Sequence, residues 1–179
     1  MLPSSVTLRD GRRAILRAAR PSDAEALTAM NRAILQETDF HIREADEYGG
    51  DPQAERRFVE QMAANGDALY LLGLVDDEIA GLLIFQRDRY RRMRHGGSLG
   101  LAVRLPYQQR GLGSAMLARF FDWVNSRPGL EKVKLEVFST NPVAQKIYER
   151  LGFVVEGVRR GDVRVQGRAV DLVLMAKYL

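Results

Sequence analysis

Apolar residues gather in short runs and alternations along much of the chain, and this pattern predicts β-strands. Near the start, "VTLRDGRRAILRAAR" predicts two strands around an Asp10-Gly11 turn, because both turn positions tolerate a positive φ angle. Further along, "ALYLLGLV" and "EIAGLLIF" predict two apolar strands joined at Asp76-Asp77, and "SLGLAV" predicts a third. We expect these three consecutive strands to form an antiparallel meander.

Longer segments repeat apolar residues every three or four positions, which predicts amphipathic helices. A first helix is expected within residues 20–38, with Ser22 or Asp23 as its cap. A second is expected over 51–66, with Asp51 as its cap and Pro52 at its first position. The other expected elements are helices over 112–125 and 141–152 and strands over 132–138, 153–160 and 170–179.

The alternation of strands and helices predicts an α/β fold with a mixed sheet. A chain of 179 residues is long enough to bury one core, so we expect one domain over residues 1–179. The chain has no cysteine and only two histidines, His41 and His95, and we expect no metal site. The longest apolar run is less than half of the roughly 20 residues that a membrane span needs, and no leader pattern precedes it. We therefore expect a cytoplasmic protein without a membrane partner.

The net charge of +4 is modest, and basic residues gather only in the segment 87–95, within "RDRYRRMRHGG". This segment permits an alternative function as a binding module, in which five arginines and Tyr90 engage nucleic acid or another acidic surface. Such a run is more often a solvated turn, so nucleic acid is not the partner that we expect.

The loop "PYQQRGLGSAML" joins the third strand of the meander to a predicted helix. A helix beginning near Gly111 or Leu112 offers unpaired N–H groups and the positive end of its dipole, and glycines let an anion approach that backbone. The loop lacks both the Lys-Ser/Thr pair of a P-loop and the spacing of a dinucleotide fingerprint. On its own, it predicts either an anion site or a plain tight turn.

Gln108, Gly111 and Gly113 fit Q/R-x-x-G-x-G/A, the pyrophosphate-binding motif of the Gcn5-related N-acetyltransferases (GNAT). Downstream, "NPVAQKIYERLGF" resembles the N-x-x-A-x-x-x-Y-x-x-x-G-F segment of the same family. The resemblance covers residues 15–179, and the C-terminal part is similar to members that acetylate amino acids or polyamines. It implies a central mixed, mostly antiparallel sheet of about seven strands, splayed between strands 4 and 5 and flanked by about four helices.

The resemblance also implies an activity and its cosubstrate. The chain is expected to transfer an acetyl group from acetyl-CoA to a primary amine of a small molecule or a peptide N-terminus, by direct attack in a ternary complex and without a metal. A coenzyme-binding sensor without turnover is the other alternative, and a homodimer is possible because exposed strand edges can pair.

The expected coenzyme site lies along the third meander strand, the glycine loop and the start of the last helix. Arg110 would add a charge-assisted contact to a phosphate. Asn141 is also a well-placed helix cap, so its role is expected to be structural as well. The coenzyme-binding residues implied are Leu101, Ala102, Val103, Gln108, Gln109, Arg110, Gly111, Leu112, Gly113, Ser114, Asn141, Ala144 and Tyr148.

Three residues are expected to act on the reacting groups. The N–H of Val103 would polarise the thioester carbonyl, and Tyr148 would act as the general acid for the departing thiolate. Alternatively, Tyr148 only packs against Ala144 and Leu151 on its helix. Glu136 is expected to be the base that deprotonates the amine through water, although it shares a strand face with Lys134 and the two side chains can instead form an ion pair.

The acceptor is expected beside the polar segment "QETDFHIREADEYGG", which follows the first helix. Its acidic residues would favour a cationic amine such as a polyamine or an amino terminus, unless the segment is simply a solvated loop. These acidic residues are Glu37, Asp39, Glu44, Asp46 and Glu47.

Overall fold

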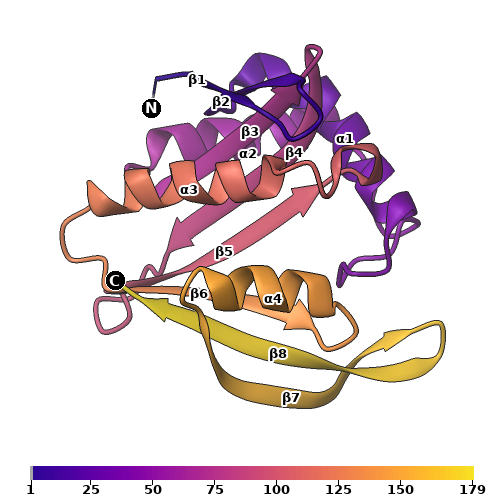
Figure 1. Cartoon of the computed structure of the whole chain (residues 1–179), viewed down its shortest axis with the longest axis vertical. Coiled ribbons are helices and arrows are strands. Elements are labelled where there is room, and N and C mark those ends of the chain that lie inside the picture. Colours follow the sequence, from indigo (N-terminus) through magenta and orange to yellow (C-terminus); the bar gives the residue numbers. More distant parts are fainter. Residues whose placement is uncertain (1) are drawn as a thin grey trace.

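A computed structural model, which describes residues 2–179, contains an eight-stranded sheet with the strand order β1-β2-β3-β4-β5-β6-β8-β7 (Figure 1). Neighbouring strands are antiparallel except β5 and β6, which are parallel. The strands are β1 (Ser4–Thr7), β2 (Arg13–Ala18), β3 (Ala68–Val75), β4 (Glu78–Arg87), β5 (Gly96–Val103), β6 (Lys132–Phe138), β7 (Val154–Val165) and β8 (Arg168–Tyr178).

Helices cover both faces of this sheet (Figure 1). On one face, α3 packs against β2 to β5 and α4 lies over β6, and on the other face α1 and α2 cover β3 and β4. Two main apolar clusters fill the spaces on the two faces, as a sheet with helices on both sides requires. The helices within residues 2–179 are α1 (Ala24–Glu37), α2 (Pro52–Ala64), α3 (Leu112–Asn125) and α4 (Pro142–Arg150), with short 3-10 turns at Pro21–Asp23 and Leu105–Tyr107.

The parallel pair β5 and β6 separates soon after it forms. Residues Gly96–Ser98 pair with Lys132–Lys134, and the pairing ends there, whereas β5 stays paired with β4 as far as Val103. The sheet therefore opens into a gap between β5 and β6. This confirms the expected mostly antiparallel, splayed sheet flanked by helices. The N-terminal hairpin brings the strands within residues 2–179 to eight, so the splayed pair is the fifth and sixth.

Local sequence signals account for most of the boundaries. Asp76 and Asp77 both have positive φ angles, 52° and 63°, as a tight turn between β3 and β4 requires. The carboxylate of Asp51 accepts hydrogen bonds from the first N–H groups of α2, and α3 begins and ends where the sequence predicts. The side-chain cap expected at the start of α1 does not form within residues 2–179. The Asp23 carboxylate instead binds Arg17, at 2.7 Å, and accepts a hydrogen bond from the N–H of Arg20. Among the described residues, none of the helices has the length and apolar character to cross a membrane.

Candidate active site

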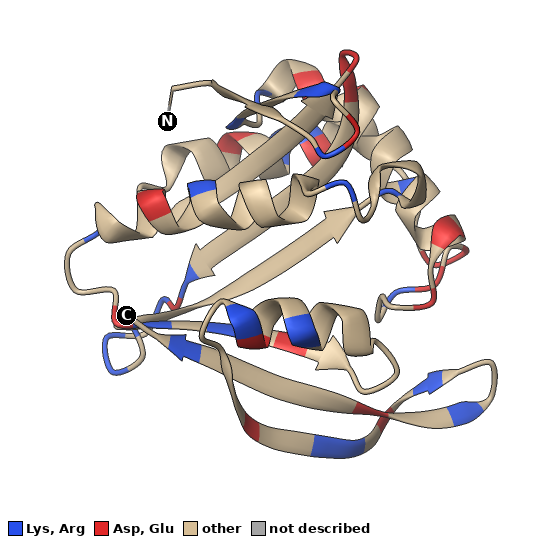
Figure 2. Cartoon of the chain, in the orientation of Figure 1, with Lys and Arg blue, Asp and Glu red and all other residues tan. Residues whose placement is uncertain are grey.

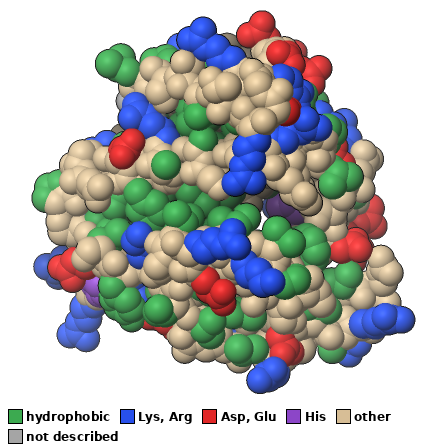
Figure 3. Space-filling model, in the orientation of Figure 1, with side chains coloured by type: hydrophobic (Ala, Val, Ile, Leu, Met, Phe, Trp, Pro, Cys, Tyr) green, Lys and Arg blue, Asp and Glu red, His purple; other side chains and the backbone are tan. Residues whose placement is uncertain are grey.

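A hollow separates α3 from α4 on one face of the molecule, with hydrophobic side chains on its floor and Lys and Arg side chains along its edges (Figure 3). The start of α3 forms part of this region. Gln109 and Gly111 have positive φ angles, 59° and 91°, which Gly111 adopts without strain because it has no Cβ. The first hydrogen bond of α3 runs from the N–H of Ala115 to the carbonyl of Gly111, at 3.0 Å. Within residues 2–179 the N–H groups of Gly113 and Ser114 donate to no acceptor, so they are available to an anion.

Two arginines lie beside this helix start. Arg110, the expected phosphate contact, forms an ion pair with Asp10 at 2.5 Å and remains partly exposed. Burial alone would raise the pKa of Asp10, but the hydrogen bonds from Arg110 and Arg12 lower that pKa to about 2. Sequence reasoning missed Arg9, whose Cγ would lie 3.7 Å from a Cβ placed on Gly111 and whose guanidinium makes no ion pair within the described part of the chain. Arg9 comes from the N-terminal hairpin, so nothing near the glycine loop in sequence identifies it.

The backbone of β5 faces the gap in the sheet. The N–H of Arg104 donates to Ala80 of β4 at 3.0 Å, and alternate residues of a strand direct their N–H groups to opposite sides. Leu101 and Val103 therefore direct their N–H groups away from β4, toward the gap where β6 no longer pairs. The side chain of Gln108 donates to the carbonyl of Val103 at 2.9 Å, so it ties the glycine loop to the end of β5.

Side chains of β5 reach both faces of the sheet. Leu101 and Val103 lie against α3, since a Cβ placed on Gly113 would be 3.6 Å from each. Ala102 packs with the cluster beneath α1 and α2. Leu112 is buried in the core, whereas Gln109 and Ser114 are exposed at the surface of the loop. This short segment of β5 is consequently accessible to groups on both faces.

The three residues expected at α4, namely Asn141, Ala144 and Tyr148, have well-defined environments. Asn141 caps the helix, because its side-chain oxygen accepts a hydrogen bond from the N–H of Ala144 at 3.1 Å. Tyr148 is 9% exposed, and its ring lies 5.5 Å from that of Phe153 in the cluster to which Ala144 and Leu151 also belong. Burial raises the pKa of Tyr148 to about 12. Its hydroxyl makes no hydrogen bond with any described residue.

Glu136 lies on the other face of β6 from α4, since its neighbours Leu135 and Val137 point into the core on the α4 side. Its carboxylate is exposed and forms an ion pair with Arg159 of β7, which also binds Asp162. The alternative pair with Lys134 does not form, because Lys134 binds Asp88 at 2.6 Å. The side chains of Glu136 and Tyr148 therefore lie on opposite faces of β6.

Two cavities flank the gap on the face covered by α1 and α2. The α1–β8 cavity has a volume of about 610 Å³ and brings Glu37 and Asp39 together with Thr140 and Arg168. The α1–α2 cavity has a volume of about 740 Å³ and reaches Ala102 of β5. Both provide space for a small molecule close to the gap.

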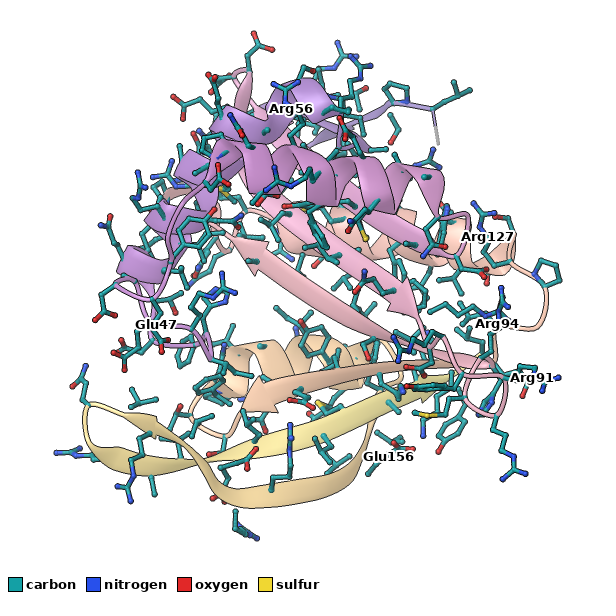
Figure 4. All side chains as sticks on the ribbon, turned by 180° about the vertical axis from the view of Figure 1, so that it is seen from behind. Glu47, Arg56, Arg91, Arg94, Arg127 and Glu156 are labelled. Carbon is teal, nitrogen blue, oxygen red and sulfur yellow. The ribbon has the colours of Figure 1, made fainter. Side chains whose placement is uncertain are left out.

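The loop between α1 and α2 lies between these cavities and contacts both halves of the sheet. Phe40 packs edge-on against Phe138 of β6, with ring centroids 6.3 Å apart, and Asp39 accepts a hydrogen bond from Gln166 beyond β7 at 3.0 Å. Of the expected acidic residues, Glu37 at the end of α1 binds Arg104 at 2.8 Å. Glu44, Asp46 and Glu47 of the loop are exposed and lie outside both cavities, and Glu47 is labelled in Figure 4.

The basic segment lies at the turn between β4 and β5, far from the glycine loop (Figures 2 and 4). Two of its five arginines, Arg87 and Arg94, bind Asp67, at 3.2 and 2.6 Å. Arg91 and Arg94 project from this turn in Figure 4. The ion pairs with Asp67 offset part of the positive charge that a nucleic-acid surface would need.

Comparison with known proteins identifies the family. The model of the acetyltransferase (GNAT) family matches residues 35–153. The L-amino acid N-acetyltransferase AaaT of Escherichia coli (strain K12) is 24% identical over 124 residues, 69% of this chain and 76% of that protein. The crystal structure of a GNAT-family acetyltransferase from Streptococcus pneumoniae has a TM-score of 0.88 and 28% identity, covering 93% of this chain and 99% of the other.

A further solved structure is yncA of Salmonella typhimurium, described as a putative acetyltransferase with its cofactor acetyl-CoA. It matches this fold with a TM-score of 0.81 at 20% identity and covers 92% of each chain. These findings confirm the family that the two motifs indicate, and with it the enzyme class and the cosubstrate. The chain belongs to the GNAT acetyltransferase family, and it is an acetyl-CoA-dependent N-acetyltransferase.

Proposed function

We propose that this enzyme transfers the acetyl group directly to a primary amine of a small molecule, such as an amino acid or a polyamine, or of a peptide N-terminus. The observation that carries this proposal is the position of β5, which has the start of α3 on one face and the α1–α2 cavity on the other. A coenzyme along the gap and an amine in the cavity would meet at the same backbone segment. The chain has no cysteine, so the thiol nucleophile of an acyl-enzyme route is lacking.

Acetyl-CoA supplies an acetyl group activated as a thioester. Backbone N–H groups of this chain are placed to bind its pyrophosphate and its thioester carbonyl. The N–H groups of Gly113 and Ser114 are placed to hold the pyrophosphate at the start of α3. Arg9 adds a positive charge beside them, whereas the charge of Arg110 is already engaged by Asp10. The N–H of Val103 is placed to donate to the thioester carbonyl, where negative charge develops during transfer.

Two protons have to move during the reaction, and each has a candidate group. The attacking ammonium must lose a proton, and Glu136 is our candidate acceptor, acting through water on the α1–α2 face. The leaving thiolate must gain a proton, and Tyr148 is our candidate donor on the α4 face. Arg159 holds the Glu136 carboxylate in place without covering it, since both side chains remain nearly half exposed.

The acceptor is best sought among small amines. The related AaaT protein is named for L-amino acids, which supports their inclusion. The α1–β8 cavity is lined by the acidic residues Glu37 and Asp39 and by the basic residue Arg168. It therefore suits a molecule that carries a positive and a negative charge, such as an amino acid.

A panel of amino acids, diamines, polyamines and short peptides, each incubated with acetyl-CoA, tests the proposal. Released thiol measures turnover, product mass identifies the acetylated molecule, and a reaction without amine gives the background hydrolysis. We expect at least one amine to be converted, with initial-rate lines that intersect when both substrates are varied, as a ternary complex requires. Failure of every amine, or parallel lines from a ping-pong mechanism, would contradict the proposal.

A further inference from the structure

Glu55 of α2 differs from the other half-buried acids of the chain. Half-buried carboxylates in residues 2–179 belong to Asp23, Glu37, Glu55, Asp67, Asp88 and Asp171. All of these except Glu55 have an arginine or lysine nitrogen within ion-pair distance. Glu55 instead accepts hydrogen bonds from the hydroxyl of Tyr70 at 3.1 Å and from the amide of Asn31 at 3.3 Å. It is therefore a partly desolvated negative charge without a positive partner in the described chain.

This carboxylate lines the α1–α2 cavity, whose other walls are largely apolar and aromatic. Tyr48 and Phe58 supply ring surfaces, while Leu82 and Ile84 of β4 and Ala102 of β5 lie on the sheet side. Aromatic rings beside a carboxylate favour a bound cation, through cation–π attraction as well as ion pairing. Because Glu55 and Ala102 line the same cavity, one small molecule there can contact both.

The other titratable groups of this cavity leave Glu55 unpaired. Arg43 lies at the exposed side with its guanidinium over the ring of Tyr48, 5.8 Å from the centroid. Both carboxylate oxygens of Asp51 accept N–H groups of α2. Burial lowers the pKa of His41, so its imidazole is neutral at pH 7 and does not neutralise Glu55. Burial also raises the pKa of Glu55, against the opposing effect of its hydrogen bonds from Tyr70 and Asn31.

We propose that the α1–α2 cavity is a subsite for the positively charged end of the acceptor, with Glu55 as its ion-pair partner. The enzyme then prefers amines that carry a second cationic group, such as alkyl diamines, with one amine at Glu55 and the other directed toward β5. This inference rests on the proposed function, because it specifies the acceptor of the same reaction. Asn31 and Tyr70 orient the carboxylate, and they leave it lone pairs for the ligand.

Binding in the absence of acetyl transfer tests the subsite directly. The enzyme is saturated with coenzyme A, and the affinities of 1,4-diaminobutane and 1-aminobutane are measured by calorimetry. These probes share a four-carbon chain and differ in the second charge. We expect the diamine to bind at least about tenfold more tightly, which corresponds to about 1.4 kcal/mol. Equal affinities in the unsubstituted enzyme would overturn the proposal whatever the variants do.

Glu55→Gln keeps the shape of the side chain and removes its charge. We expect this variant to lose the preference for the diamine, because its affinity for the diamine should fall by more than its affinity for 1-aminobutane. Glu60→Gln is the matched control, since Glu60 lies on the exposed side of the same helix, outside the cavity, and its loss changes the net charge equally. A preference that survives in Glu55→Gln, or disappears equally in Glu60→Gln, would refute the assignment.

Turnover with the same two amines separates the two proposals. A chain that binds the diamine through Glu55 but acetylates no amine contradicts the proposed function and leaves the subsite intact. Acetylation of both amines, with KM values that are the same in the unsubstituted enzyme and in Glu55→Gln, supports the proposed function and refutes the subsite. In the expected result, Glu55→Gln raises KM for the diamine about tenfold or more and changes KM for 1-aminobutane much less.

Discussion

Tyr148 combines a buried ring with a hydroxyl that no described residue engages. With its pKa raised to about 12 by burial, the hydroxyl is fully protonated at neutral pH. Transfer of its proton to a thiolate of ordinary basicity, with a pKa of about 8.5, is then uphill. The hydroxyl is therefore better suited to donating a hydrogen bond to the departing sulfur than to releasing its proton early.

Replacing Tyr148 with Phe should lower kcat by about 100-fold, near the lower end of the range for general acids, because of this mismatch. Thermal stability should hardly change, since the lost hydroxyl has no protein partner in residues 2–179. Tyr90→Phe, at the exposed turn between β4 and β5, is the control. Turnover near that of the unsubstituted enzyme from pH 6 to 10 would show that Tyr148 only packs.

Among the elements, the start of α3 depends on the conformation of one residue. Gly111 precedes the helix with a φ angle of 91°, and this turn sets the direction of the free N–H groups that follow. A Cβ at this position would meet only Arg9, at an ordinary van der Waals distance of 3.7 Å. The requirement for glycine is therefore one of backbone conformation and not of space.

Gly111→Ala should destabilise the protein by about 1–2 kcal/mol and weaken the binding of coenzyme A, because alanine strongly disfavours a left-handed conformation. Urea unfolding and calorimetry measure the two effects. Gly66→Ala is the matched control, since its φ angle is not positive and a Cβ there meets nothing within 4 Å. If both variants behaved alike, the N–H groups of α3 would not depend on this turn.

Sequence patterns predicted the helices α2, α3 and α4 well, because their signals are local. The bounds of α3 and the caps at Asp51 and Asn141 follow from residues within a few positions of each helix end. Glu55 and Arg9 escaped this reasoning for a physical reason. Glu55 looks like an ordinary acid in the first turn of a helix, and its hydrogen-bond partners Asn31 and Tyr70 are distant in sequence.

At the scale of the molecule, ion pairs connect segments that are remote in sequence, as Asp10 and Arg110 show. The pKa of Asp67 is lowered by its hydrogen bond from Arg94, and that of Glu156 by its hydrogen bond from Lys132. A carboxyl whose pKa is lowered in the folded state contributes stability above its unfolded pKa of about 4. That contribution is lost as the pH falls through the folded value.

The free energy of unfolding should therefore fall as the pH is lowered from about 5 to about 2, the lowered pKa of Asp10 marking the end of the range. The decline should weaken in 1 M salt, because these pairs are partly exposed and salt screens them. Asp23→Asn, which removes the ion-pair partner of Arg17, should make the free energy of unfolding depend less on pH. Asp122→Asn, with its nearest guanidinium nitrogen at 3.9 Å, should not. Stability constant across this range, measured by urea titration, would contradict this account.

The gap between β5 and β6 also divides two kinds of recognition. In the proposed function, the groups offered to acetyl-CoA on the α3 side are mainly backbone N–H groups, whose direction depends on strand and helix geometry. On the α1–α2 side, the cavities are lined by side chains from one loop and the helices next to it, together with side chains of the sheet and of the hairpin between β7 and β8. If the amine binds there, as we propose, its choice can be redesigned from residues of α1, α2 and the loop between them, while the half proposed to hold acetyl-CoA is left as it is.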